Sequence, residues 1–144
     1  MSRTITADTI YQQLRDRGFR LTAGRRALIA VLLNTPTPLT VNDIQVLLMN
    51  QHVQVNLTTI YRELEFLIQQ ELVHEIRIGD DSVKRFEFSL GAHHHHIRCL
   101  QCNNIADVII PHHFTTEMKK IERQTGYTVI DHALEFVGLC AECK

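Results

Sequence analysis

Hydrophobic positions in the first half of the chain recur at the spacing of amphipathic helices. Ile10 and Leu14 share one face of a first helix that we expect to end near Gly18. The apolar positions of three further helices are Leu28, Val31 and Leu32; Ile44, Leu47 and Leu48; and Ile60, Leu64, Leu67 and Ile68. The expected caps of these helices are Thr22, Thr40, and either Asn56 or Thr58. Short helices with tight connections are typical of a helix-turn-helix domain.

The pattern changes to strands after position 71. Residues 72–78 alternate apolar and polar side chains, a turn follows at 79–81, and residues 83–88 return, which predicts a β-hairpin. A hairpin directly after a recognition helix is the wing of a winged helix. Beyond it we expect strands at 95–100 and 104–110, a helix at about 114–125 that ends at Gly126, and strands from 127 to 139. The predicted fold class is α+β, with a winged helix-turn-helix domain at 1–88, a hinge at 89–92 and a small α/β domain at 93–144.

Composition narrows the class of protein. The chain has 144 residues, 44% of them hydrophobic, which is enough for a packed core. It lacks an apolar run of membrane-spanning length and begins with polar sequence, so we predict a cytoplasmic protein without a membrane partner. The net charge of −1 favours no particular partner. Five arginines do gather near the start, and guanidinium groups pair well with phosphate, although a solvated helix face explains such a group equally well. These are Arg15, Arg17, Arg20, Arg25 and Arg26, of which we take Arg20 and Arg25 as the candidate DNA contacts.

The cysteines form two Cys-x-x-Cys pairs, Cys99 with Cys102 and Cys140 with Cys143. Four thiolates from two such pairs suit a closed tetrahedral zinc site, which stabilises a fold. Two disulfides in a secreted protein are the alternative, and the missing secretory signal disfavours it. One motif alone would also fit a redox pair. We therefore predict a structural Zn²⁺ site.

A run of four histidines, His93 to His96, precedes the first cysteine pair. Side chains alternate along a strand, so His94 and His96 point to one face while His93 and His95 point to the other. We expect His94 and His96 to join two hairpin residues in a site for a regulatory divalent ion, which would link the two domains as a switch. Those hairpin residues are His74 and Glu87. His93 and His95, on the opposite face, could form an auxiliary metal site with His132 and with His112 or His113. His74 and His132 are equally compatible with ordinary surface or core histidines that bind no metal.

The start of the fourth helix carries side chains suited to DNA. Recognition helices contact base edges near their first turns. The hydroxyls of Thr58 and Thr59 can bond phosphate or bases, the Tyr61 ring can pack on a thymine methyl group, and Arg62 can hold phosphate. A half-buried Tyr61 in the core is the alternative. Useful affinity for double-stranded DNA would require a dimer that reads two half-sites.

Taken together, these motifs resemble the ferric uptake regulator (Fur) family of bacterial metal-dependent repressors over nearly the whole chain. The resemblance rests on the histidine run, both cysteine pairs and the segment 57–62. It implies a homodimer, with a C-terminal dimerisation domain, that represses metal-homeostasis genes from AT-rich palindromic operators when loaded with metal. It also implies Asp107 as a further carboxylate ligand of the regulatory site and Arg20 as a minor-groove cation. For four groups of residues, the roles that the resemblance implies agree with those inferred above from the residues themselves. Cys99, Cys102, Cys140 and Cys143 are structural zinc ligands, and Glu87, His94 and His96 are regulatory ligands. His93, His95 and His132 are auxiliary ligands, and Tyr61 and Arg62 are DNA contacts.

Several positions depart from the family pattern. Residues 21–25 read Leu-Thr-Ala-Gly-Arg where the family usually has Leu-Thr-Pro-Gln-Arg, and the histidine that iron sensors often carry before the third helix is absent. His74 matches a ligand of zinc sensors, so we favour Zn²⁺ over Fe²⁺, with Mn²⁺ as a further candidate. The auxiliary site has Phe114 at its acidic position, and His113 or Glu117 would have to replace that ligand.

Two other functions compete with this hypothesis. One is a peroxide-sensing, iron-dependent repressor of the same family, although such sensors tend to carry aspartate where this chain has Glu87. The other is a zinc-dependent hydrolase whose metal has an open position. A His-Glu-x-x-His helix and a nucleophile–base pair are both absent from the sequence, so we expect neither an enzyme nor a small organic substrate.

Overall fold

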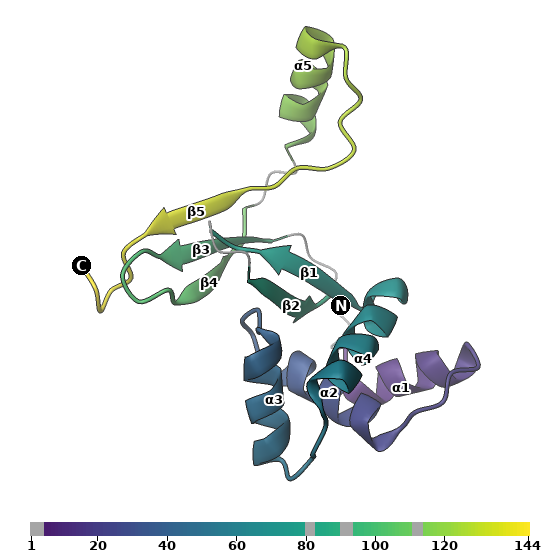
Figure 1. The fold of residues 1–144 in the computed structure, drawn as a ribbon. Coiled ribbons are helices and arrows are strands. Elements are labelled where there is room, and N and C mark those ends of the chain that lie inside the picture. The colour runs from purple at the N-terminus through teal and green to yellow at the C-terminus, as the bar shows by residue number, and fades with distance from the viewer. Residues whose placement is uncertain (1–4, 80–82, 90–93, 111–113) are drawn as a thin grey trace. The chain divides into compact units, whose positions relative to one another are not determined.

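The computed structural model describes residues 5–79, 83–89, 94–110 and 114–144. The chain divides into two compact units, Met1–Leu90 and Gly91–Lys144 (Figure 1). The predicted hinge at 89–92 falls mostly outside the described residues, so the predicted domain boundaries stay a prediction. Among the helices described, none is long and apolar enough to cross a membrane.

The first unit contains four helices, and the last three begin at the predicted caps. A side-chain oxygen of each cap accepts a hydrogen bond from the backbone N–H three residues further on. Thr40 and Asp43 complete a reciprocal capping box, and Asn56, not Thr58, caps the fourth helix. The helices and their caps are α1 (Ala7–Asp16, Thr6), α2 (Ala23–Asn34, Thr22), α3 (Val41–Asn50, Thr40) and α4 (Leu57–Gln69, Asn56).

The predicted hairpin is also present in this unit. Strands β1 (Val73–Arg77) and β2 (Lys84–Phe88) pair antiparallel, and His74 lies opposite Glu87. Leu39, in the connection between α2 and α3, forms an isolated bridge with Phe86. That bridge ties the hairpin to the helices. The first unit therefore has the elements of the predicted winged helix-turn-helix.

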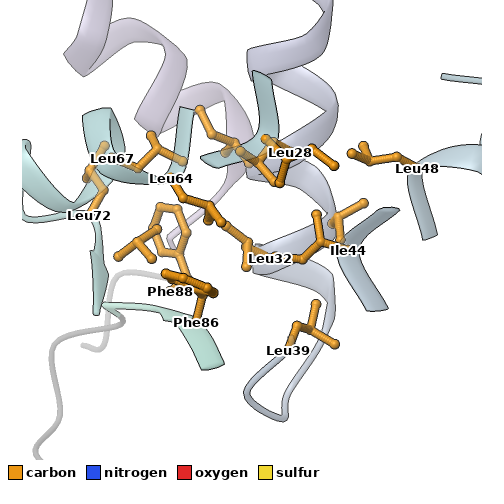
Figure 2. Packing of buried hydrophobic residues seen from close by; sticks show 14 of the residues in the cluster. Leu28, Leu32, Leu39, Ile44, Leu48, Leu64, Leu67, Leu72, Phe86 and Phe88 are labelled. Atoms are coloured by element: carbon orange, nitrogen blue, oxygen red, sulfur yellow. The ribbon is translucent and has the colours of Figure 1, made fainter. Parts of the chain in front are cut away.

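The core of the first unit explains why α4 presents one face to solvent. Leu64 and Leu67 of α4 pack among apolar side chains of α2, α3 and β2 (Figure 2). Each fully buried leucine contributes roughly 1.5–3 kcal/mol of hydrophobic stabilisation. The other labelled members of this cluster are Leu28, Leu32, Leu39, Ile44, Leu48, Leu72, Phe86 and Phe88. With its apolar side fixed in this way, α4 leaves Tyr61 52% exposed.

The second unit is a three-stranded sheet with one helix. Strand β3 (His95–Cys99) lies between β4 (Ile105–Val108), with which it is antiparallel, and β5 (Glu135–Gly138), with which it is parallel. Helix α5 (Thr115–Thr125) ends at Gly126, whose φ of +76° is the left-handed conformation that glycine tolerates best. The predicted helix and the first two predicted strands of this unit are confirmed.

The expectation of strands throughout 127–139 was wrong for most of that range. Only 135–138 forms a strand, and residues 126–134 have no regular structure. The backbone N–H of Val129 donates to a carboxylate oxygen of Glu122 at 2.9 Å, so it takes part in no strand ladder. Tyr127 and Ile130 are 77% and 93% exposed. Residues that favour strands still require a neighbouring strand to pair with.

Candidate metal centres and DNA-contact residues

The topology of the second sheet brings the two cysteine pairs together. Cys99 ends β3 and pairs in register with Gly138 of the parallel strand β5, two residues before Cys140. The four sulfur atoms all lie within 4.8 Å of one another, and the Sγ atoms of Cys102 and Cys140 are 3.7 Å apart. None of the four is in a disulfide. Four clustered thiols match the closed coordination shell of structural zinc.

The electrostatics of this cluster also fit a cation. Backbone N–H groups, first that of Cys102 and then that of Cys140, donate to the sulfur of Cys99 and lower its pKa to about 6. The Cys140 N–H lies 3.4 Å from that sulfur. Hydrogen bonds with the sulfurs of Cys140 and Cys102 raise the pKa of Cys143 to about 12. A Zn²⁺ ion would replace these shared protons, because it binds thiolates and releases protons as it does so.

A second cluster of potential ligands lies on the same sheet. The antiparallel register of β3 and β4 places His96 opposite Asp107, and His94 precedes β3 by one residue. One ligand atom from each of these three residues lies within 4.8 Å of the others. The His94 and His96 rings meet edge to face with centroids 5.0 Å apart, as expected for side chains of the same strand parity. Two imidazoles and a carboxylate suit zinc, iron or manganese.

The hairpin of the first unit offers two further ligands. His74 and Glu87 are directly opposite each other in the β1–β2 ladder, so their side chains emerge on one face of the hairpin. The Nε2 atom of His74 is 2.8 Å from the hydroxyl oxygen of Ser89. From the sequence, Ser89 was placed in the predicted hinge, and its contact with His74 was not predicted. Its place two residues after Glu87, directly after the end of β2, was the available signal.

The predicted auxiliary residues are brought together only in part. His95 is 4% exposed, and its ring centroid lies 5.6 Å from that of His132. The ring of Phe114 lies 5.8 Å from His95 and 5.4 Å from His132, so the three form one aromatic cluster. His93 and His113, like His112, lie outside the described residues.

The candidate DNA contacts of α4 are mostly exposed. Thr58, Tyr61 and Arg62 are exposed and Thr59 is half-buried, and the exposure of Tyr61 does not fit the core alternative. Tyr61 also lines a hollow of about 260 Å³ together with residues of α3 and the hairpin, among them Lys84. Lys84 was missed by the sequence reasoning, although it is the first lysine of the chain. Its position beside Tyr61 depends on the hairpin register.

The two arginines outside α4 that were predicted to contact DNA differ from each other. Arg20 is exposed in the connection between α1 and α2. Arg25 has a side chain only 14% exposed, and its Nε lies 2.6 Å from Oε2 of Glu63 on α4. The guanidinium of Arg25 is therefore engaged with a carboxylate of the same unit.

The model of the ferric uptake regulator family matches residues 16–137. The chain belongs to that family. It is 33% identical over 142 residues to the ferric uptake regulation protein of Bacillus subtilis (strain 168), a match that covers 95% of this chain and 93% of that protein. It is also 33% identical over 135 residues to the peroxide-responsive repressor PerR of Staphylococcus aureus (strain Mu50 / ATCC 700699), covering 91% and 86%.

Solved structures of family members have the same fold. The Helicobacter pylori ferric uptake regulator Fur, whose structure is described as revealing three functional metal-binding sites, superposes with a TM-score of 0.78 at 22% identity. That match covers 99% of this chain and 97% of the other. The ferric uptake regulator of Francisella tularensis with iron gives 0.74 at 25% identity, covering 88% and 95%.

Family membership decides the broad class of function. Members of the ferric uptake regulator family are metal-dependent transcription regulators that bind DNA as dimers, and they are not enzymes. The predicted family is therefore confirmed, and the zinc-hydrolase alternative is set aside. The chain is equally identical, at 33%, to a ferric uptake regulation protein and to a peroxide-responsive repressor.

Proposed function

We propose that this protein is a metal-responsive repressor of metal-homeostasis genes, which binds AT-rich palindromic operators as a metal-loaded homodimer. One observation carries the proposal: strand β3 contributes both to the cysteine cluster, through Cys99, and to the His94–His96–Asp107 cluster, through His96. A sheet that is fixed by one metal ion is thus the scaffold on which a second ion is bound. We assign the cysteine cluster to structural Zn²⁺ and the other cluster to the regulatory ion.

In this proposal Glu87 and His74 of the hairpin complete the regulatory site. His94, His96 and Asp107 supply three ligands from the second unit, and the hairpin presents a carboxylate and an imidazole on one of its faces. An ion held by ligands from both units restricts their relative motion, because coordination requires all the ligands at bonding distance together. Metal binding then favours the arrangement of the two units that binds DNA.

The DNA-binding surface in this proposal is built around α4. Exposed Tyr61 contacts bases in the major groove, and exposed Arg62 holds phosphate. The hydroxyls of Thr58 and Thr59 contact phosphate or bases, and Arg20 contacts the minor groove. The core supports this role because it fixes α4 through its opposite, apolar face. Lys84 of the hairpin is a further candidate for a phosphate contact.

The homodimer is supported by the sparse core of the second unit. Among its described residues, only His95, Cys99 and Ile105 are buried. Large apolar side chains remain exposed on α5, on the segment that follows it, on β5 and directly after β5, and pairing with a second copy would cover them. These are Ile121 at 46%, Tyr127 at 77%, Ile130 at 93%, Val137 at 55% and Leu139 at 52%.

For the sensed metal we favour zinc. His74 adds a third imidazole to the proposed site, and nitrogen-rich ligand sets suit zinc better than manganese. The peroxide-sensing alternative is supported by the similarity to the staphylococcal repressor. If that alternative holds, the iron-loaded protein exposed to peroxide gains the mass of one oxygen atom on His94 or His96. The zinc-sensor proposal expects no such gain.

Footprinting on AT-rich palindromic duplexes tests the proposed function. Protein that retains only its structural zinc is titrated with buffered Zn²⁺, Fe²⁺ or Mn²⁺. We expect protection of a palindromic site to appear on metal addition, at the lowest free concentration for zinc. Absence of metal-dependent protection with every ion would contradict the proposed function. A response to iron or manganese without a response to buffered sub-nanomolar zinc would contradict only the choice of metal.

A further inference from the structure

Arg25, in the first turn of α2, forms a two-pronged ion pair with Glu63 of α4. The Nε atom of Arg25 lies 2.6 Å from Oε2 of Glu63, and Nη2 lies 3.3 Å from Oε1. Both side chains are 14% exposed, so solvent screens the pair much less than it would at the surface. The pair joins residues 38 positions apart in the sequence.

The remaining sides of the same guanidinium are occupied as well. Nη1 of Arg25 donates to the backbone carbonyl of Arg20 at 2.8 Å. Phe66 lies one turn of α4 beyond Glu63, and the guanidinium carbon of Arg25 is 3.7 Å from the centroid of its ring. The guanidinium group therefore stacks on the face of the Phe66 ring. Phe66 in turn meets Phe19 edge to face at 5.0 Å. One side chain thus holds the segment containing Phe19 and Arg20 against α4.

We propose that Arg25 is a positioning residue for DNA recognition, and that it does not itself bind phosphate. It sets the spacing between Arg20 and the exposed Arg62, which directly precedes Glu63. A duplex that is read in one groove by α4 and in the next by Arg20 requires that spacing to be fixed. This inference rests on the proposed function.

The geometry of Arg25 is specific to arginine. A planar fork can form the two-pronged pair, donate to a carbonyl and stack on a ring at the same time, whereas the point charge of lysine cannot. The substitution Arg25→Lys therefore keeps the charge and loses the positioning. Glu63→Gln gives the complementary test, because it removes a negative charge close to the DNA-contacting residues.

The experiment measures the affinity of metal-loaded wild type, Arg25→Lys, Arg25→Gln and Glu63→Gln for an operator duplex and for a scrambled duplex over a range of salt concentrations. Arg62→Gln is the matched control for a phosphate contact, and it should make the negative slope of log affinity against log salt less steep by about 0.9. We expect the Arg25 and Glu63 variants to bind the operator about tenfold or more weakly, the scale of one lost base contact, at an unchanged slope. Their affinity for the scrambled duplex should stay close to that of wild type.

The scrambled duplex separates positioning from simple loss of folded protein, because unfolding weakens binding to both duplexes equally. If the salt dependence of Arg25→Gln is less steep than that of wild type, as in the Arg62 control, and Glu63→Gln binds more tightly, then Arg25 contacts phosphate and the inference is overturned. Wild-type affinity of Arg25→Lys for the operator would overturn it as well. Failure of the wild type to bind any palindrome in response to metal would instead contradict the proposed function.

Discussion

His96 lies opposite Asp107 in the β3–β4 ladder, and its Nε2 atom is 3.7 Å from the Oδ1 atom of Asp107. This separation is longer than a hydrogen bond. It is close to the distance of about 3.3 Å between two ligand atoms of one tetrahedral zinc ion. The His96 side chain is 12% exposed and that of Asp107 is 42% exposed, so the pair can be reached by an ion from solvent. The arrangement suits an exchangeable metal site.

Substitution of Asp107 tests that site without touching the cysteines. We expect Asp107→Asn to lower affinity for the regulatory ion by about a hundredfold or more, because even residues that only support a ligand cost 10–100-fold. One zinc per protomer should remain. Metal analysis together with DNA binding checks this prediction, with Asp16→Asn at an exposed position of α1 as the control. An Asp107→Asn protein that keeps a second ion and a full response would count against Asp107 as a ligand.

The cysteine cluster should be required for folding of the second unit. We expect Cys99→Ala to lose its zinc and most of the cooperative thermal transition of that unit, since structural zinc contributes roughly 10–16 kcal/mol in small zinc-dependent folds. The sparse core of this unit supplies little to offset the loss. Zinc analysis and thermal unfolding followed by circular dichroism are the measurements. If Cys99→Ala retained one zinc and the wild-type melting temperature, the structural assignment would be wrong.

His74 should set metal preference more than overall response. Removal of one imidazole weakens a site for zinc more than for manganese, because manganese prefers oxygen ligands. We therefore expect His74→Ala to reduce zinc affinity by roughly tenfold more than manganese affinity, a scale typical of ligand-shell changes. Competition titrations with buffered metals measure the ratio. If His74→Ala lost the same affinity for both ions, or lost affinity for neither, His74 would not be the ligand that sets metal preference.

Phe114 should prevent a third metal site in the second unit. Its ring lies between 5 and 6 Å from both the His95 and His132 rings, so an apolar group stands where a further ligand would be needed. We expect two bound ions per wild-type protomer and a third in Phe114→Glu, while Phe114→Leu stays at two. Metal content after dialysis decides between these outcomes. Three ions in the wild type, one of which is lost in His132→Ala, would show that the auxiliary site forms in spite of Phe114.

Local sequence signals predicted much of this fold. Thr22, Thr40 and Asn56 mark helix starts because their side chains satisfy free backbone N–H groups whatever the rest of the chain does. Strand parity likewise grouped His94 with His96, and their rings meet in the structure.

Longer-range relationships could not be predicted in the same way. Arg25 was grouped with other arginines as a phosphate ligand, because sequence spacing gives no sign that Glu63 of α4 lies beside it. The apolar residues near Ile130 indicated a strand, but pairing depends on a neighbour that the described part of this chain does not provide.

The central claim is that occupation of the His94–His96–Asp107 site controls DNA binding. Its most direct test is the affinity for a palindromic operator of protein that holds only structural zinc, measured by fluorescence anisotropy as buffered metal is added, for wild type and Asp107→Asn. We predict that wild-type affinity rises by about a hundredfold, a coupling of roughly 3 kcal/mol, as the second ion binds, while Asp107→Asn stays at the one-zinc level. Equal affinity of the one-zinc and two-metal wild type would contradict the account.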